Sequence, residues 1–309
     1  MAGTETRERS RTTAAGMVRY VVAGDGTRIA YRTRGPLEAK AGGATFVLTN
    51  GLSTTDEFWG PLVRGLVAEH RVADWWYRGH GESEVSRSND YLVGTHADDL
   101  ARVTGAASGD DGARPPVHVA FSMGVTVLLE LYRAHPERVG AMVLVAGGAD
   151  HPYASAPLFR LPFAHAAVRS ALRLAAPIVP ALSPVARRVT SSSALFPLAR
   201  SVGALGRSAP RAELERFFRS VGEMDLRAYW GTLESLMEAR ASDVLPTVRV
   251  PVLVVAPERD VMALRGDLVA LREGIPGAEW VLLPHTSHAV LLEAGDAIAA
   301  RVRAFVAPR

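Results

Sequence analysis

A serine, an aspartate and a histidine far apart in this sequence could together carry out nucleophilic catalysis. Ser122 ends the apolar run VHVAFS, Asp260 ends VLVVAPERD, and His288 ends WVLLPHTSH. A serine hydroxyl is a weak nucleophile by itself, so it needs a base to take its proton and an acid to orient that base. The three residues, in this chain order, predict a triad that attacks an acyl carbonyl.

The context of Ser122 indicates how such a serine could be exposed. A strand-like run ends at Phe121 and the helix-like run GVTVLLELYRAH follows, with the small residues Ala120 and Gly124 on either side of the serine. This pattern predicts a tight turn that projects the side chain outward. Ser122 could instead be an ordinary helix-capping serine, but the strand before it and the partner motifs favour the nucleophile.

Two backbone N–H groups are expected to stabilise the negative charge that forms on the substrate oxygen. One donor follows the nucleophile at the start of the helix, and the other comes from the loop after the third strand. That loop reads TNGLSTT, and we assign the two donors to Met123 and Leu52.

Eight short apolar runs predict the strands that position these residues. They read MVRYVVA, TRIAYRT, ATFVLTN, RVADWWY, VHVAFS, AMVLVAG, PVLVVA and AEWVLLP. Helical spacing is found over residues 57–70, 91–106, 124–135, 264–274 and 291–306. Apolar strands that alternate with helices indicate an α/β fold with a mostly parallel sheet covered on both faces, whereas the GDG turn makes the first pair antiparallel. Ligands bind such sheets beyond the carboxyl ends of the strands, where the three candidate residues fall.

The chain divides into a tail, a core and an insertion. Residues 1–16 are polar and predict a flexible tail, and residues 17–149 and 247–309 form the core. Residues 150–246 contain no convincing strand and predict a helical cap or lid. Within residues 151–210 there are seven arginines and no acidic residue. We interpret this insertion as a solvated lid, and the alternative is a surface for an anionic or lipid-like substrate or for a membrane.

Composition excludes several classes of protein and site. The chain has 309 residues, 48% of them hydrophobic and 22% charged, as is typical of a globular protein. It has no cysteine, so disulfides, thiol catalysis and Cys-ligated zinc are excluded, and a net charge of +3 does not favour nucleic acid. No apolar run is long enough to cross a membrane and the N-terminus lacks the apolar region of a secretory signal, so we expect a cytoplasmic protein. No metal-binding or phosphate-loop pattern is present, so we expect no metal and no cofactor.

The motifs together resemble those of the α/β-hydrolases, in particular the small esterase and lipase-like members. The resemblance rests on AFSMG, NGLST, RGHGES, PERD and PHTSH, and it extends from about Val18 to Val306. It favours His288 over its neighbour His285 as the base, and Asp260 over Asp150 as the acid. It also implies structural roles for His80, His96 and His118.

Three positions depart from the usual pattern of that family. Ala120 replaces the first glycine of GxSxG, Asn50 replaces a histidine, and Trp76 replaces an aspartate whose polar contact would give way to aromatic packing. The residues expected to bind substrate are Phe121, Asn50, Ser53, Trp59 and His285.

From these features we expect a serine hydrolase that cleaves a carboxylic ester, with lactones and thioesters included, through an acyl-enzyme. Its partner would be a small acyl substrate of hydrophobic character. The same triad also serves carbon–carbon bond hydrolysis, acyl transfer, perhydrolysis and cyclisation. A different alternative is a ligand-binding protein that keeps the fold without turnover.

Overall fold

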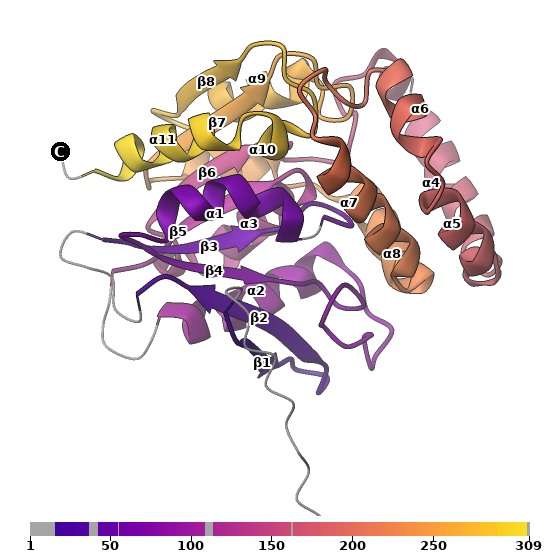
Figure 1. Ribbon diagram of the computed structural model, residues 1–309, viewed down its shortest axis with the longest axis horizontal. Helices are drawn as coiled ribbons and strands as arrows, with labels where there is room; N and C mark the ends of the chain where they lie inside the picture. The colour runs from indigo at the N-terminus through magenta and orange to yellow at the C-terminus, as the bar shows by residue number, and fades with distance from the viewer. Residues whose placement is uncertain (1–15, 37–42, 55, 109–113, 162, 308–309) are drawn as a thin grey trace, which may run out of the picture.

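An eight-stranded, mostly parallel sheet forms the centre of the protein (Figure 1). The computed structural model describes residues 16–36, 43–54, 56–108, 114–161 and 163–307. The strands are β1 (Val18–Val22), β2 (Arg28–Arg34), β3 (Thr45–Thr49), β4 (Arg71–Trp75), β5 (Val117–Phe121), β6 (Ala141–Val145), β7 (Val252–Pro257) and β8 (Glu279–Leu283). Their order is β1-β2-β4-β3-β5-β6-β7-β8; β2 runs antiparallel to both β1 and β4, and the other pairs are parallel. The predicted fold class and the antiparallel first pair are confirmed.

Helices cover both faces of this sheet. They are α1 (Gly60–Leu66), α2 (Val93–Ser108), α3 (Met123–Ala134), α9 (Arg265–Gly274), α10 (Val290–Glu293) and α11 (Gly295–Val306). Apolar residues of α2, α3 and α9 join one buried cluster, and those of α1, α10 and α11 join another. The central strands are mostly apolar because both of their faces are buried, and β5 and β6 are buried at every position.

Two predicted helices are interrupted in the structure. The run at 57–70 begins as a 3₁₀ helix, η1 (Asp56–Trp59), and α1 then starts with Pro61 in its first turn, where a missing N–H is tolerated. The run at 291–306 breaks at Ala294 (φ −139°, ψ 23°) into α10 and α11. At this break the chain passes close to the start of α1, since a Cβ on Gly295 would lie 2.6 Å from Cβ of Pro61. The helical periodicity of the sequence continues through the break and gives no sign of this close approach.

Between β6 and β7 the described chain forms helices and no strand beyond one isolated bridge between Asp150 and Arg240. These are η3 (Pro157–Arg160), α4 (Ala164–Ala175), η4 (Val179–Leu182), α5 (Ser183–Thr190), α6 (Leu195–Ser201), α7 (Arg211–Glu223), α8 (Leu226–Glu238) and η5 (Ser242–Thr247). Figure 1 shows α4, α5 and α6 on the outer side of α7 and α8. Leu214 of α7 belongs to the core cluster of α1, α10 and α11, and Leu236 of α8 belongs to that of α2, α3 and α9. These two helices therefore attach the segment to the sheet.

Candidate active site

Ser122 occupies a strained turn between β5 and α3. Its backbone has φ 54° and ψ −121°, a region that non-glycine residues rarely adopt. The turn is held because the Ser122 N–H donates to the carbonyl of Val145 at 2.9 Å. Glycines permit the close approach of neighbouring chain: a Cβ on Gly124 would lie 2.5 Å from the Thr49 oxygen, and one on Gly147 would lie 2.4 Å from the Ser122 oxygen. A side chain at either glycine would displace the turn.

The structure brings Ser122, Asp260 and His288 together at the carboxyl ends of β5, β7 and β8. Nε2 of His288 lies 3.1 Å from Oγ of Ser122, and Nδ1 of His288 lies 2.8 Å from Oδ2 of Asp260. With a proton on Nδ1, the imidazole donates to the carboxylate and leaves Nε2 free to accept the serine proton. The Asp260 side chain is 1% exposed and that of His288 is 14% exposed, so little water competes for these bonds.

Backbone donors fix the carboxylate of Asp260. Its Oδ1 accepts the N–H groups of Met262 and Ala263 at 2.8 and 2.9 Å, which leaves Oδ2 directed at the imidazole. The aspartate is thereby oriented independently of the histidine.

Glu293 anchors the loop that carries the histidine. Its carboxylate accepts the Ser287 N–H at 2.7 Å and the Ser287 hydroxyl at 2.6 Å, and it also accepts the N–H of Gly206 at 2.8 Å. The ring of Phe121 packs against the imidazole, with 5.0 Å between ring centroids. Sequence reasoning missed Glu293, because a glutamate five residues after the histidine has no pattern that distinguishes it from a solvated charge.

The two rival residues lie in other networks. The His285 side chain is 74% exposed, and its Nδ1 accepts from the guanidinium of Arg259 at 2.9 Å. Asp150 accepts the N–H groups of Ala241 and Ser242, both at 3.0 Å, and so closes the base of the helical segment.

Three other histidines are buried in the core. Burial lowers the pKa of His80 and His96 and lowers that of His118 to about 4, so all three are neutral at neutral pH. A ring nitrogen of His80 contacts the Arg78 carbonyl, and one of His118 contacts the Arg138 carbonyl. A ring nitrogen of His96 contacts the Thr232 hydroxyl.

The loop after β3 passes directly against the nucleophile. A Cβ on Gly51 would lie 2.9 Å from Cβ of Ser122, which places Leu52 in the adjoining position. Met123 is the first residue of α3, where the opening N–H groups have no acceptor within the helix. Leu52 and Met123 therefore follow directly on the two segments that meet at the nucleophile.

Asn50 and Trp59 support this loop from within. The Asn50 oxygen accepts from Nε1 of Trp59 at 2.6 Å, and its amide donates to the carbonyl of Trp75 at 2.6 Å. Asn50 is 4% exposed and Trp59 is fully buried. Both polar side chains are used to hold the loop, because a buried amide or indole N–H must find partners.

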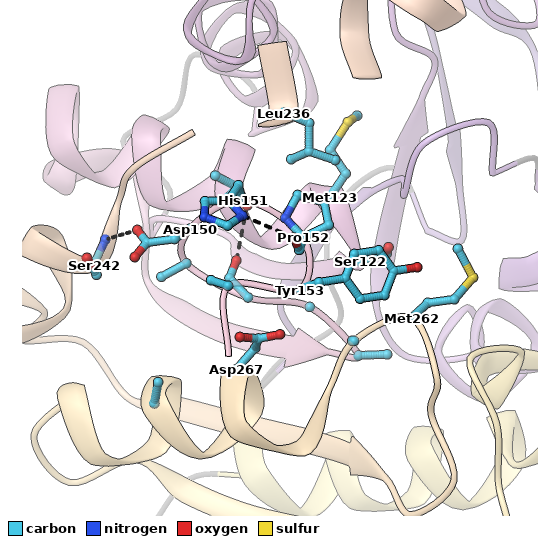
Figure 2. Close-up of a pocket in the computed structure, with 18 of the residues that line it drawn as sticks. Ser122, Met123, Asp150, His151, Pro152, Tyr153, Leu236, Ser242, Met262 and Asp267 are labelled. Atoms are coloured by element: carbon cyan, nitrogen blue, oxygen red, sulfur yellow. Dashed lines mark hydrogen bonds between the residues drawn. The ribbon is translucent and has the colours of Figure 1, made fainter. Parts of the chain in front are cut away.

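A cavity of about 120 Å³ begins at Ser122 and His288. Its wall includes the small-residue run 146–149, Leu236 of α8, Tyr153 and Met262. Figure 2 shows Ser122, Tyr153 and Met262 at one end of it and Asp150 and His151 at the other. In the described part of the chain, this lining includes none of the five predicted substrate-binding residues: Phe121 and Ser53 are buried beside it, and His285 is exposed.

Tyr153 is a cavity residue that the sequence did not reveal. Its backbone has φ 63°, and burial raises the pKa of its hydroxyl, which therefore stays neutral and can donate a hydrogen bond. A tyrosine in a run with no periodicity gives no sign of such a position.

The match to known proteins accounts for this combination of sheet, turn and cavity. The sequence profile of the α/β-hydrolase fold matches residues 44–295. The chain belongs to this family. As an α/β-hydrolase it is a member of a family of hydrolytic enzymes, and the predicted family is confirmed.

Individual relatives of this α/β-hydrolase are distant. It is similar to a putative carbamate hydrolase, RutD, from Caulobacter sp. (strain K31), with 25% identity over 85% of this chain and 90% of the relative. A protein of the same name from Azorhizobium caulinodans is 26% identical over 82% of this chain and 87% of the relative. Among solved structures, the esterase RhEst1 from Rhodococcus sp. ECU1013 matches with a TM-score of 0.72, 23% identity and coverage of 94% and 98%. The enol-lactonase from Burkholderia xenovorans LB400 matches with a TM-score of 0.69, 22% identity and coverage of 93% and 99%.

The described part of this α/β-hydrolase shows neither a metal-binding cluster nor a membrane-spanning helix. Within the described ranges, no group of three or more histidine, aspartate or glutamate side chains is arranged to hold a metal ion. Over those same ranges, every helix is too short or too polar to cross a bilayer.

Proposed function

We propose that this protein hydrolyses carboxylic esters through an acyl-enzyme on Ser122. The proposal is supported above all by the continuous contact from Oγ of Ser122 through the His288 ring to the Asp260 carboxylate. The strained turn, which holds the hydroxyl at the cavity, is a second support, since strain of this kind persists where the surrounding structure enforces it.

The reaction would proceed in two halves. Oγ of Ser122 attacks the carbonyl carbon while Nε2 of His288 takes the hydroxyl proton, and the N–H groups of Leu52 and Met123 stabilise the oxyanion. The C–O bond to the alcohol then breaks, and His288 returns the proton to the departing oxygen. Water enters, gives its proton to His288 and attacks the acyl carbon, which releases the acid and restores the serine. Throughout, Asp260 stabilises the positive imidazolium.

The size of the cavity favours a short acyl group. Sites for drug-sized ligands occupy roughly 300–1,000 Å³, whereas this cavity measures about 120 Å³. We therefore propose that the substrate carries a compact, hydrophobic acyl chain.

A series of 4-nitrophenyl esters of increasing acyl length tests this proposal. We expect kcat/KM to fall at least about tenfold between butyrate and octanoate, because each methylene that does not fit costs a substantial factor. Leu236→Ala enlarges the cavity and should reduce the ratio of kcat/KM for butyrate to that for octanoate. Because both substrates are measured on the same variant, any loss of folded protein cancels in this ratio. Equal rates from acetate to octanoate would show that the acyl group does not occupy this cavity.

Carbamate hydrolysis is a second candidate because the two curated relatives carry that name and the cavity is small. A carbamate presents its carbonyl carbon to the same nucleophile. Rates on 4-nitrophenyl acetate and 4-nitrophenyl N-methylcarbamate distinguish the two: ester hydrolysis predicts the higher kcat/KM for the acetate, and the opposite order would favour the carbamate.

The role of Asp260 gives a prediction with a matched control. Asp260→Asn should lower kcat about 10⁴-fold, because an amide facing Nδ1 favours the wrong imidazole tautomer. Asp150→Asn removes the other acid that follows a strand. Because Asp150 binds the amides of Ala241 and Ser242 at the end of the cavity away from Ser122, this change should alter kcat by less than about tenfold. Steady-state hydrolysis of 4-nitrophenyl acetate measures both. If the two variants lose activity equally, Asp260 is not the orienting acid.

A further inference from the structure

The outer helix α4 packs on the protein through a side that mixes ion pairs with small apolar contacts. Arg169 and Arg173 of α4 form ion pairs with Glu238 of α8, and Arg173 also pairs with Glu234 at 3.0 Å. On the same side, Nε1 of Trp230 donates to the Leu172 carbonyl at 2.9 Å. The same inward side carries Ala164, which is buried, and Val168, which is half-buried. A surface helix ordinarily exposes polar residues on its opposite side, but α4 does not.

A second apolar stripe, which begins just before α4 and ends just after it, faces away from the protein. Phe163, Leu174 and Ile178 are 67%, 78% and 62% exposed, and with Ala167 and Ala171 they recur at spacings of four, four, three and four residues. At 100° per residue these positions share one side of a helix. We name Phe163, Leu174 and Ile178 the outer stripe. Beyond it, Leu182, Val185 and Val189 continue the exposed apolar surface along η4 and α5, with 47%, 58% and 52% exposure.

Unpaired positive charge accompanies this apolar surface. Arg187 and Arg188 of α5, Arg200 of α6 and Arg207 are exposed, and each lacks an acidic partner among the described residues. The sequence contains no aspartate or glutamate from 151 to 210, and the two α8 glutamates nearest α4 are already paired. The surface therefore combines large exposed apolar side chains with uncompensated arginines.

We propose that this face, made of α4, η4 and α5, docks on an anionic lipid surface. The outer stripe would enter the boundary between headgroups and acyl chains, while Arg187 and Arg188 would bind lipid phosphates, as amphipathic helices do in the membrane interface. Such docking is peripheral, since the helices concerned have 12 and 8 residues.

Charge favours this occupant over a second copy of the chain. In a two-fold symmetric dimer the same patch meets itself, so the arginines of one copy would face those of the other. The stretch 151–210 has no acidic residue that could pair with these arginines. A dimer of this kind would therefore bring like charges together. An anionic bilayer offers both complements at once: negative headgroups for the arginines and an apolar interior for the outer stripe.

Vesicle flotation tests the docking surface on the full chain. We expect the wild-type protein to float with vesicles of phosphatidylcholine and phosphatidylglycerol and to remain at the bottom with phosphatidylcholine alone. Replacing the outer stripe by Phe163→Ser, Leu174→Ser and Ile178→Ser should weaken the partition at least about 100-fold. Arg187→Gln with Arg188→Gln should weaken the partition about 30-fold. This difference from the wild type should disappear in high salt, which screens the attraction between arginine and lipid phosphate.

Matched controls change the same residue types elsewhere. Met17, Val22 and Leu92 are 64%, 60% and 57% exposed on the core, and their replacement by serine should leave vesicle binding unchanged. The same holds for Arg19→Gln with Arg64→Gln, both exposed core positions. Ser122→Ala should bind as the wild type does, so the docking result is independent of the proposed hydrolysis.

Two results would overturn the proposal. One is a wild-type chain that stays at the bottom with anionic vesicles even in low salt. The other is equal flotation of the outer-stripe variant and the Met17, Val22 and Leu92 control. If, in addition, sedimentation equilibrium shows a dimer that only the outer-stripe variant loses, the face is an interface between copies of the chain.

Discussion

Replacing His288 by alanine should lower kcat for 4-nitrophenyl acetate by about 10⁵–10⁶-fold, while replacing His285 should lower it less than about tenfold. The difference arises because only the His288 ring contacts both Oγ of Ser122 and the carboxylate of Asp260. Without it the serine proton has no acceptor during attack and the alcohol has no donor when it leaves. His285, by contrast, is exposed and contacts Arg259.

This comparison is sharp because the two histidines lie three residues apart in one loop. A general disturbance of the loop would affect both variants, so circular dichroism and thermal unfolding should be recorded for each. A small loss at His288 together with a large loss at His285 would reverse the assignment of the base.

Replacing Ser122 by alanine should lower kcat about 10⁵–10⁶-fold, as the loss of His288 does, and leave KM or ligand affinity little changed. The residual rate would come from the oxyanion donors and substrate binding alone, with water as the nucleophile. Because serine and alanine both tolerate this turn poorly, the substitution does not add backbone strain.

Ser122→Ala combined with His288→Ala should be no less active than either single variant. The two residues act in the same step, so once one is replaced the other no longer contributes to catalysis. The reductions in kcat from the two substitutions therefore do not add. Ser201→Ala is the matched control: this serine is exposed in α6, where its hydroxyl donates to the Leu198 carbonyl, and kcat should stay within about twofold of the wild type.

The core of the fold could be predicted because its local signals agree with its tertiary role. The run VHVAF is apolar at successive positions and is followed directly by a helical pattern, so both the buried strand β5 and the start of α3 could be placed from sequence. Parallel strands then require their carboxyl ends to meet, and this explains why residues from positions 122, 260 and 288 converge.

The surroundings of the site could not be predicted, since they depend on contacts between segments with no local signature. Glu293 reaches Gly206 across 87 residues. Tyr153 reaches the cavity because the chain takes a positive φ there. Asn50 was placed in the pocket by its neighbourhood in sequence, yet its amide turns toward Trp59 and Trp75.

The orientation of α4 escaped sequence analysis for a related reason. Its periodicity identifies a broad apolar side, but it does not say which part of that side faces the protein. The glutamates of α8 help to decide this, because they pair with Arg169 and Arg173, which lie on a different side of α4 from the outer stripe. Only the packed arrangement of both helices exposes the outer stripe.

The central claim, that Ser122 is the attacking nucleophile, is tested most directly by intact-protein mass spectrometry after treatment with a fluorophosphonate. The account predicts one covalent adduct per wild-type chain, located at Ser122 by peptide mapping, and none on Ser122→Ala. An adduct of equal yield on both proteins, or a wild-type chain that hydrolyses esters yet takes up no label, would contradict it.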